Sequence, residues 1–410
     1  NQVFKLKYSR TFASLKHPNF RLWFSGQVVS LVGTWMQSTA QGYLVYELTA
    51  SPIMLGVVGF ANGIPAWLFS LYAGIIADRI SRRKLLIITQ GSMMLLALAL
   101  ALLTFSGKVQ AWHVVIMALL LGTANAFDAP ARQSFVSEMV TKEDLANAIA
   151  LNSTVFNLGI VIGPTIAALV YAWFGPAWCF TINAISFIAV LSALFMMHLP
   201  PRAPVIATEK SVVHELTTGM RYAFGDENIR VLLIMLTACS MFGFGLLNLM
   251  PAWATHVLGG DVRTNGLLLS ARGVGSLAGA LMIASIGGRV IRGKIWSVGS
   301  VVMPISLILF SLFRTLPISL IMLVAFGWSL MSVVNVTNAL IQTHVPDELR
   351  GRVMGVYILL FQGGTPIGAL LAGGLAGNIS EATTVLIFAS IILIVALTIH
   401  LRQPSIRKYN

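Results

Sequence analysis

Residues 74–85 read GIIADRISRRKL, and this short stretch lies between two long apolar segments. Five of its twelve residues are charged, whereas only 10% of the whole chain is charged. The apolar segments on either side are each long enough to cross a bilayer, which requires about 20 residues. The stretch is therefore predicted to be a tight polar loop that joins two membrane-spanning helices at one face of the membrane.

The rest of the chain repeats this pattern of long apolar segments and short polar connections. Hydrophobic residues make up 57% of the 410 residues, and the mean hydropathy is +0.83. A typical soluble domain is about 25% charged, and the short alternating segments of a transmembrane barrel do not occur in this sequence. We predict an all-α polytopic membrane protein with spans near 20–46, 52–77, 85–106, 111–129, 145–173, 176–199, 230–257, 264–287, 295–314, 316–341, 353–376 and 382–401.

The net charge of +13 comes from basic residues that lie mostly on one side of these spans. If the N-terminus is cytoplasmic, all but four of the 27 Lys and Arg residues fall on cytoplasmic segments, the exceptions being Lys108, Arg263, Arg272 and Arg314. This is the positive-inside pattern of membrane proteins. It places both termini in the cytoplasm and explains the basic composition without a nucleic-acid partner.

The longest polar connection, residues 200–229, divides the spans into six and six. We expect an N-terminal bundle at 1–199, a cytoplasmic linker at 200–229 that contains an amphipathic helix, and a C-terminal bundle at 230–410. The halves also repeat, because a shift of 210 residues aligns Gly56 with Gly266 and Arg82 with Arg292. A parallel repeat of six spans, related by an axis along the membrane normal, is typical of transporters that bind their solute between two bundles.

The charged loop resembles the loop between spans 2 and 3 of the major facilitator superfamily. Ser81 lies where the superfamily motif usually has a glycine. The matching residues are Gly74, Asp78, Arg79, Arg82 and Arg83. The resemblance implies twelve helices in two six-helix bundles related by a pseudo-two-fold axis.

Other parts of the chain extend this resemblance over its whole length. Gly159, Gly163 and Pro164 in span 5 resemble the motif associated with antiporters of the superfamily. The stretches HPNFRLWFSGQ, FDAPARQSF and QTHVPDELRGRVMG look like the branch that contains enterobactin exporters and macrolide efflux (drug:proton antiporter) pumps. This branch implies a multi-pass protein of a bacterial-type cytoplasmic (inner) membrane.

The resemblance also implies a role for the acid in the charged loop. Basic residues hold such a loop in the cytoplasm, but an acid adds little to topology, so Asp78 needs another explanation. Span 11 begins near Arg350 on the same face, and a carboxylate at a helix N-terminus gains roughly 0.3–1 kcal/mol. We therefore expect Asp78 to act as a gate latch at the start of span 11.

The inner end of span 4 carries a second acid, Asp128. An acid at that depth requires a partner. Arg82 of the charged loop is expected to reach it, and Arg132, one helical turn further along span 4, is the rival partner.

Polar residues recur at three- and four-residue steps in spans 1 and 10, with a weaker pattern in span 7. In the superfamily, spans 1, 4, 7 and 10 line the cavity. The alternative is that these side chains form hydrogen bonds between helices. Aromatic neighbours favour a bulky, partly apolar solute. The candidate cavity residues are Gln27, Thr34, Gln37, Gln41, Asn125, Phe244, Asn248, Asn335 and Asn338.

Two charged residues in the spans have alternative interpretations. Glu47, which ends span 1, is either a proton site or a surface residue. Arg272, about two turns into span 8, either contacts an anionic solute or Glu47, or extends its side chain to the membrane interface. We find no acid at mid-membrane in the sequence, which leaves Glu47 as the candidate for proton coupling.

The glycines of spans 5 and 8 suggest a close helix contact, because small residues let helices approach each other. Gly159, Gly163 and Pro164 are expected to pack against glycines of span 8, namely Gly273, Gly275 and Gly279. This contact would be either a pivot between bundles or packing alone.

These features together predict a secondary transporter rather than an enzyme. We expect export of a hydrophobic or amphiphilic solute, drug- or siderophore-like, by alternating access and in exchange for protons. A lipid or lysophospholipid transporter of the same fold is the alternative. The sequence has no metalloprotease, hydrolase or nucleotide-binding motif, so no cofactor or metal is expected. The expected partners are the solute, protons and membrane lipid, and the expected state is a monomer.

Overall fold

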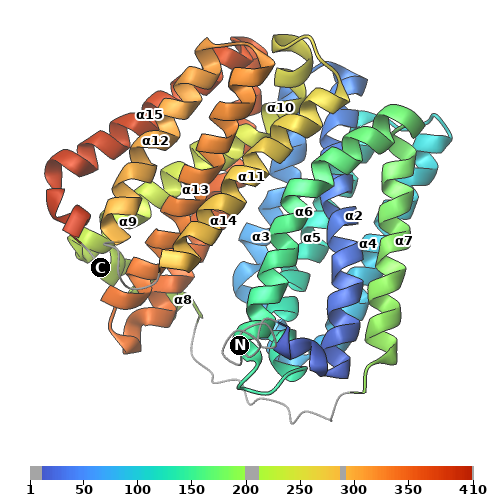
Figure 1. The fold of residues 1–410 in the computed structure, drawn as a ribbon, viewed down its shortest axis with the longest axis horizontal. Coiled ribbons are helices and arrows are strands. Elements are labelled where there is room, and N and C mark those ends of the chain that lie inside the picture. Colours follow the sequence, from blue (N-terminus) through green and yellow to red (C-terminus); the bar gives the residue numbers. More distant parts are fainter. Residues whose placement is uncertain (1–11, 199–211, 287–291, 409–410) are drawn as a thin grey trace, which may run out of the picture. The chain divides into compact units, whose positions relative to one another are not determined.

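The structure is a computed structural model that describes residues 12–198, 212–286 and 292–408. Within the third helix, side chains are not described at residues 70–71, 74–75 and 77–79. The described residues form helices and no strands (Figure 1). This agrees with the predicted all-α membrane fold.

Twelve helical segments follow the predicted spans in order. The first six are α2 (Pro18–Thr49), α3 (Pro52–Arg79), α4 (Arg82–Phe105), α5 (Ala111–Phe135), α6 (Leu145–Phe174) and α7 (Pro176–Met196). The last five are α11 (Val262–Ile286), α12 (Arg292–Leu312), α13 (Leu316–His344), α14 (Asp347–Asn378) and α15 (Glu381–Arg402). In the described residues, eleven of the twelve are long and apolar enough to cross a membrane. The exception is α2, whose Gln, Ser and Thr residues dilute its apolar surface.

The seventh span is irregular and changes helix type along its length. It consists of α9 (Glu227–Ala238), the π-helical η3 (Cys239–Phe244), the 3₁₀-helical η4 (Gly245–Leu249), the short α10 (Met250–Ala252) and the π-helical η5 (Trp253–Val257). π-Helical turns inside helices occur frequently at functional sites. Span 7 therefore becomes a candidate for contact with a solute.

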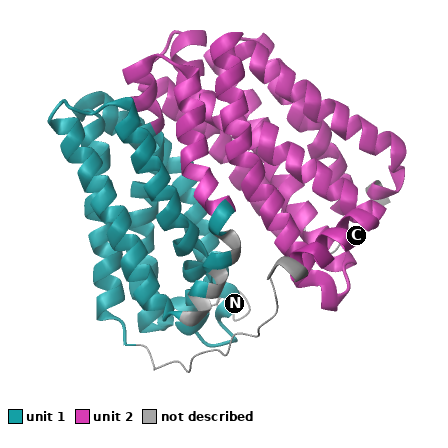
Figure 2. Cartoon of the chain, turned by 180° about the vertical axis from the view of Figure 1, so that it is seen from behind, with its two compact units in different colours: residues 1–41, 68–208 teal, residues 42–67, 209–410 magenta. Residues whose placement is uncertain are grey.

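The chain divides into two compact units, each described here by itself (Figure 2). Unit 1 comprises residues 1–41 and 68–208, and unit 2 comprises residues 42–67 and 209–410. Helices α2 and α3 thus each contribute residues to both units. The predicted bundle boundaries at 199 and 230 stay a prediction.

The core of unit 1 lies where α4 packs against α5 and α7. Its buried aromatic residues include Phe20, Trp23 and Phe135, and the rings of the last two meet edge to face at 5.3 Å. A short 3₁₀ helix, η1 (Ala13–Lys16), joins this unit at the start of α6. It is held there by polar contacts near Asp144.

In unit 2, α13 packs between α11 and α12, and α12 also contacts α15. Trp253 of η5 stacks on Phe310 of α12 with ring centroids 4.2 Å apart. The expected linker helix is present as α8 (Val212–Gly225), which packs against α14. Glu215 of α8 accepts two hydrogen bonds from Arg352 of α14, at 3.0 and 3.1 Å.

The first half of α3 lies in unit 2, where it packs tightly against α14. A Cβ atom on Gly56 would lie 2.6 Å from the carbonyl oxygen of Ala369 and 3.0 Å from the Cα of Gly373. A Cβ on Gly63 would lie 2.9 Å from Pro366. Only glycine permits these approaches, so small residues bring the two helices together here.

Candidate functional site

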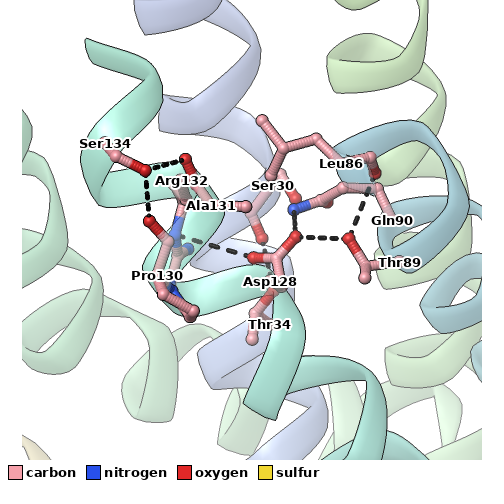
Figure 3. A network of polar contacts seen from close by, with 10 residues as sticks. All are labelled: Ser30, Thr34, Leu86, Thr89, Gln90, Asp128, Pro130, Ala131, Arg132 and Ser134. Atoms are coloured by element: carbon pink, nitrogen blue, oxygen red, sulfur yellow. Dashed lines mark hydrogen bonds and ion pairs between the residues drawn. The ribbon is translucent and has the colours of Figure 1, made fainter. Parts of the chain in front are cut away.

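A buried polar network surrounds Asp128 near the C-terminal end of α5 (Figure 3). Asp128 is only 1% exposed. One of its carboxylate oxygens accepts hydrogen bonds from Thr89 Oγ1 at 2.8 Å and Gln90 Nε2 at 2.9 Å, both on α4. The other lies 3.7 Å from Nε of Arg132, one turn along the same helix. These contacts compensate a charge that would otherwise be costly to bury.

The expected pairing of Arg82 with Asp128 is wrong. Arg82 Nη1 donates instead to the carbonyl oxygen of Ser134 and to Oε1 of Glu138, both at 3.0 Å. Glu138 lies in a 3₁₀ turn directly after α5, η2 (Val136–Glu138), which is farther from the loop in sequence than Asp128 is. Arg132, the alternative partner, lies beside Asp128. The sequence feature that could have identified this pairing is Glu138, the acid that follows the end of span 4.

The remaining residues of the loop motif give less information. The side chains of Gly74, Asp78 and Arg79 lie outside the described residues, although their backbone continues α3. Arg83 Nη2 donates a hydrogen bond to the carbonyl oxygen of Phe195 at the end of α7, at 3.0 Å. This contact ties the loop to the C-terminal end of α7 in unit 1, and the role of Asp78 stays a prediction.

The glutamines of α2 lie inside unit 1 rather than on an accessible surface. Gln27 and Gln37 are each 2% exposed, and Gln41 is 5% exposed. Gln37 accepts a hydrogen bond from Asn183 of α7 at 2.5 Å, and Gln41 donates to the carbonyl oxygen of Val114 of α5 at 3.3 Å. For Gln37 and Gln41 the alternative of interhelical hydrogen bonding therefore holds. Thr34 is half-buried, and its hydroxyl donates to the carbonyl oxygen of Ser30.

The glycines of span 5 approach α2 within unit 1, and their expected contact with the glycines of span 8 stays a prediction. A Cβ atom on Gly163 would lie 2.5 Å from Cβ of Trp35, and one on Gly159 would lie 2.8 Å from the Trp35 ring. Phe156 of α6 meets the same ring edge to face, and Pro164 is buried. Gly275 and Gly279 in turn approach α13 of their own unit. The motif thus provides a flat helix face that receives the Trp35 indole.

Four candidate amides are half-exposed, unlike the glutamines of α2. Asn125 lies on α5 of unit 1, and Asn248, Asn335 and Asn338 lie in unit 2. Neither Asn125 nor Asn335 has a hydrogen-bond partner among the described residues. Amide groups of this kind can bind a polar group of a solute.

Aromatic and amide groups lie together on span 7 of unit 2. Phe244, the last residue of the π-helical η3, is half-buried and meets Phe361 of α14 edge to face at 5.4 Å. Asn248 lies one turn later and donates to the carbonyl oxygen of Gly245 at 3.2 Å. On α13, Asn338 accepts a hydrogen bond from Gln342 at 2.6 Å. This part of unit 2 is amphipathic.

The two candidate charges differ in burial. Glu47 is exposed, which favours its interpretation as a surface residue. Arg272 is only 8% exposed and forms no ion pair with the described residues. The sequence analysis missed a buried acid, Glu381 at the start of α15, which is 3% exposed and lies 3.1 Å from His256 Nδ1. Its place next to a loop gave no sign of burial.

A second charged cluster lies at the start of α6. Asp144 Oδ2 lies 2.7 Å from Lys16 Nζ and 2.8 Å from His17 Nε2, and Thr141 donates to the same oxygen. The hydrogen bonds from Lys16 and His17 lower the pKa of Asp144 to about 2. This cluster is structural, because it fixes η1 to unit 1.

Comparison with known proteins gives a consistent set of relatives. A family model described as "Transmembrane secretion effector" matches residues 9–409. The staphyloferrin A transporter of Staphylococcus aureus (strain NCTC 8325 / PS 47) is 26% identical over 355 residues, which cover 86% of this chain and 88% of that protein. The enterobactin exporter of Shigella flexneri is 24% identical over 397 residues, which cover 96% of this chain and 94% of the exporter.

Among solved structures, a bacterial homologue of the human lysosomal transporter Spinster has a similar fold. The TM-score is 0.72 over 96% of this chain and 98% of the homologue, at 13% sequence identity. At this identity the similarity concerns the fold alone. It supports the twelve-helix architecture expected from the sequence.

Proposed function

The chain belongs to the transmembrane secretion effector family of the major facilitator superfamily, and from this membership we propose that it exports a hydrophobic or amphiphilic solute by alternating access. It is a membrane transporter, as its relatives are. The enterobactin exporter provides the precedent for outward transport.

The proposed solute site lies in the amphipathic part of unit 2, on span 7 and α13. Phe244 and Asn248 lie on an irregular helix, and Asn335 on α13 has no partner among the described residues. Solute sites combine an apolar lining with a few polar groups that fix orientation. Transporters also place such sites on interrupted helices. An amphiphilic solute would use the aromatic rings for its apolar part and the amides for its polar part.

Proton exchange is proposed as the driving reaction. The buried acids Asp128 and Glu381 are each held by a base or by hydrogen-bond donors. Glu381 with His256 is the better placed pair, because His256 belongs to the π-helical η5 of span 7 and its side chain is 71% exposed. Because the His256 side chain is exposed, solvent reaches this pair without a path through the core of unit 2.

The gate latch at Asp78 is the third part of the proposal. It is motivated by the match to the superfamily loop motif and by the expectation that span 11 begins near Arg350. Neutralising Asp78 should shift the chain toward the inward-open state. Cysteine-accessibility labelling of Asp78→Asn at both membrane faces would show this shift, and an unchanged labelling ratio would exclude the latch.

The experiment that tests the function measures efflux of a fluorescent amphiphile. N-phenyl-1-naphthylamine, loaded into pump-deficient bacterial cells, should leave faster when the chain is expressed. Collapse of the proton gradient with an uncoupler should abolish the difference. Equal efflux with and without expression would contradict the proposal.

The alternative function, lysophospholipid transport, requires a separate measurement. Proteoliposomes that contain fluorescent lysophosphatidylcholine should keep the fraction of probe protected from dithionite if the chain exports solutes only. Rapid loss of the protected fraction, without any proton gradient, would favour lipid transport instead.

A further inference from the structure

Arg272 lies near the middle of the membrane-spanning helix α11. Helix α11 begins at Val262, ten residues before Arg272. At 1.5 Å per residue this places the Arg272 backbone about 15 Å below the start of the helix. Half of a hydrocarbon core of about 30 Å is also about 15 Å, and transporters bind their solutes near the midplane.

The position of Arg272 on α11 places it away from the exposed face of this helix. Leu267, Val274 and Leu281 are 43–57% exposed and repeat at intervals of seven, which marks the outward face of α11. Arg272 is two residues before Val274 and therefore lies about 160° away, on the inward face. Arg272 is 8% exposed, so its side chain is buried in the protein rather than facing lipid.

The guanidinium has no counter-charge within the described residues. Its Nε atom is buried without a hydrogen-bond partner, and neither terminal nitrogen has one. The acids of unit 2 that form ion pairs are each paired with another base: Glu215 with Arg352, Asp347 with Arg350 and Glu381 with His256. A guanidinium has five N–H donors, and a buried charge without partners is strongly unfavourable. The missing partner must therefore come from outside these residues.

Other unpartnered polar groups share the same part of the unit. Asn265, two turns before Arg272 on the same inward face, is fully buried, and both polar atoms of its side chain lack a partner among the described residues. The hydroxyl of Ser319, at the corresponding end of the adjacent α13, is also buried and unpartnered. Helices α11 and α13 touch here, because a Cβ atom on Gly327 would lie 2.1 Å from the carbonyl oxygen of Arg272.

We propose that Arg272 binds an anionic oxygen group of the transported solute, and that Asn265 binds a neutral polar group of it. Arginine suits this role because its planar fork pairs with carboxylates and related oxyanions through two hydrogen bonds. The inference rests on the proposed transport function and adds to it the solute class: an amphiphile that carries a carboxylate or similar anion. Long arginine side chains on helices extend toward the N-terminus, so the guanidinium lies on the Asn265 side of its backbone.

A matched pair of probes tests the charge preference directly. The full chain, purified in nanodiscs of zwitterionic phosphatidylcholine, is titrated with 2-naphthoate and with the neutral 2-naphthamide. We expect naphthoate to bind at least about tenfold more tightly, because hydrogen bonds to an ionised acceptor are about twice as strong as neutral ones. In Arg272→Gln the preference should disappear through loss of naphthoate binding, with naphthamide unaffected, while Arg272→Lys should keep part of it.

The control variant is Arg263→Gln, which removes an exposed arginine from the same helix. It should bind both probes as the unchanged chain does. The inference is overturned if the unchanged chain binds both probes equally, or if Arg272→Gln keeps the preference. It is also overturned if chloride alone stabilises the chain in an Arg272-dependent manner and naphthoate does not compete, because the site would then hold an inorganic anion. Efflux of the uncharged N-phenyl-1-naphthylamine reports on the transport function independently of all these outcomes.

Discussion

The polar network at Asp128 leads to a prediction that distinguishes the contact in the structure, with Arg132, from the pairing expected from the sequence, with Arg82. Replacing Asp128 by Asn removes the charge but keeps an oxygen that Thr89 and Gln90 can use. The interaction with Arg132 is then lost, whereas Arg82 keeps its contacts with Ser134 and Glu138. A double-mutant cycle can measure these two couplings separately.

The size of the Arg132 coupling follows from the geometry. Two unit charges at the observed 3.7 Å attract each other by about 4 kcal/mol at an effective dielectric constant of about 20. The Arg132 side chain is 22% exposed, so water weakens this attraction. We expect a coupling energy of about 1–3 kcal/mol between Asp128→Asn and Arg132→Gln. For Asp128→Asn with Arg82→Gln we expect less than about 0.5 kcal/mol.

The assay is unfolding of the purified chain in detergent, followed by tryptophan fluorescence. Arg82→Gln combined with Glu138→Gln provides a positive control, since these side chains lie 3.0 Å apart. A coupling of Asp128 to Arg82 that exceeds its coupling to Arg132 would refute the reasoning. It would show that the contact expected from the sequence, and not the one in the structure, stabilises the protein.

Three further predictions concern other parts of the chain. Gly163→Val should reduce stability by about 1–3 kcal/mol and slow efflux of N-phenyl-1-naphthylamine, because the valine side chain would collide with Trp35. The control is Gly91→Val, which should leave efflux unchanged because an added Cβ there meets nothing within 4 Å. Asp144→Asn should lower the melting temperature at pH 7. The pKa of Asp144 is lowered to about 2 in the folded chain, from about 3.9 when unfolded. The difference in melting temperature between the two proteins should therefore be full above pH 4 and vanish as the pH falls toward 2. A difference in melting temperature that persists at pH 2 would contradict the ion-pair cluster. Arg272→Met should leave the melting temperature unchanged or raise it, because an unpaired buried charge is replaced by an apolar side chain, and a large decrease would reveal a partner within the protein.

The spans and the linker helix were predictable because they depend on local patterns. Long apolar runs, the loop charges and the amphipathic stretch before Gly225 are each contained in a few neighbouring residues. The irregular course of span 7 was not predictable. Its apolar run between Glu227 and Val257 does not reveal that the backbone changes from α to π hydrogen bonding at Cys239.

The site residues were identified more reliably than their partners. Asp128 and Arg272 stood out as charges in apolar segments, and both are buried. Their neighbours depend on helix rotation and on contacts between distant parts of the chain. Glycines in span 5 likewise indicated a close approach, but the sequence could not show that Trp35 of α2 fills it.

The central claim is that the chain moves an amphiphilic solute by alternating access, and solute counterflow tests it most directly. Proteoliposomes preloaded with unlabelled 2-naphthoate are diluted into labelled 2-naphthoate, and the same is done with 2-naphthamide. A transporter that exposes one site alternately to each side produces a transient accumulation of label above equilibrium. We predict this accumulation for naphthoate with the unchanged chain, and its loss in Asn335→Leu. Simple equilibration of both probes, with no transient excess of label, would contradict the account.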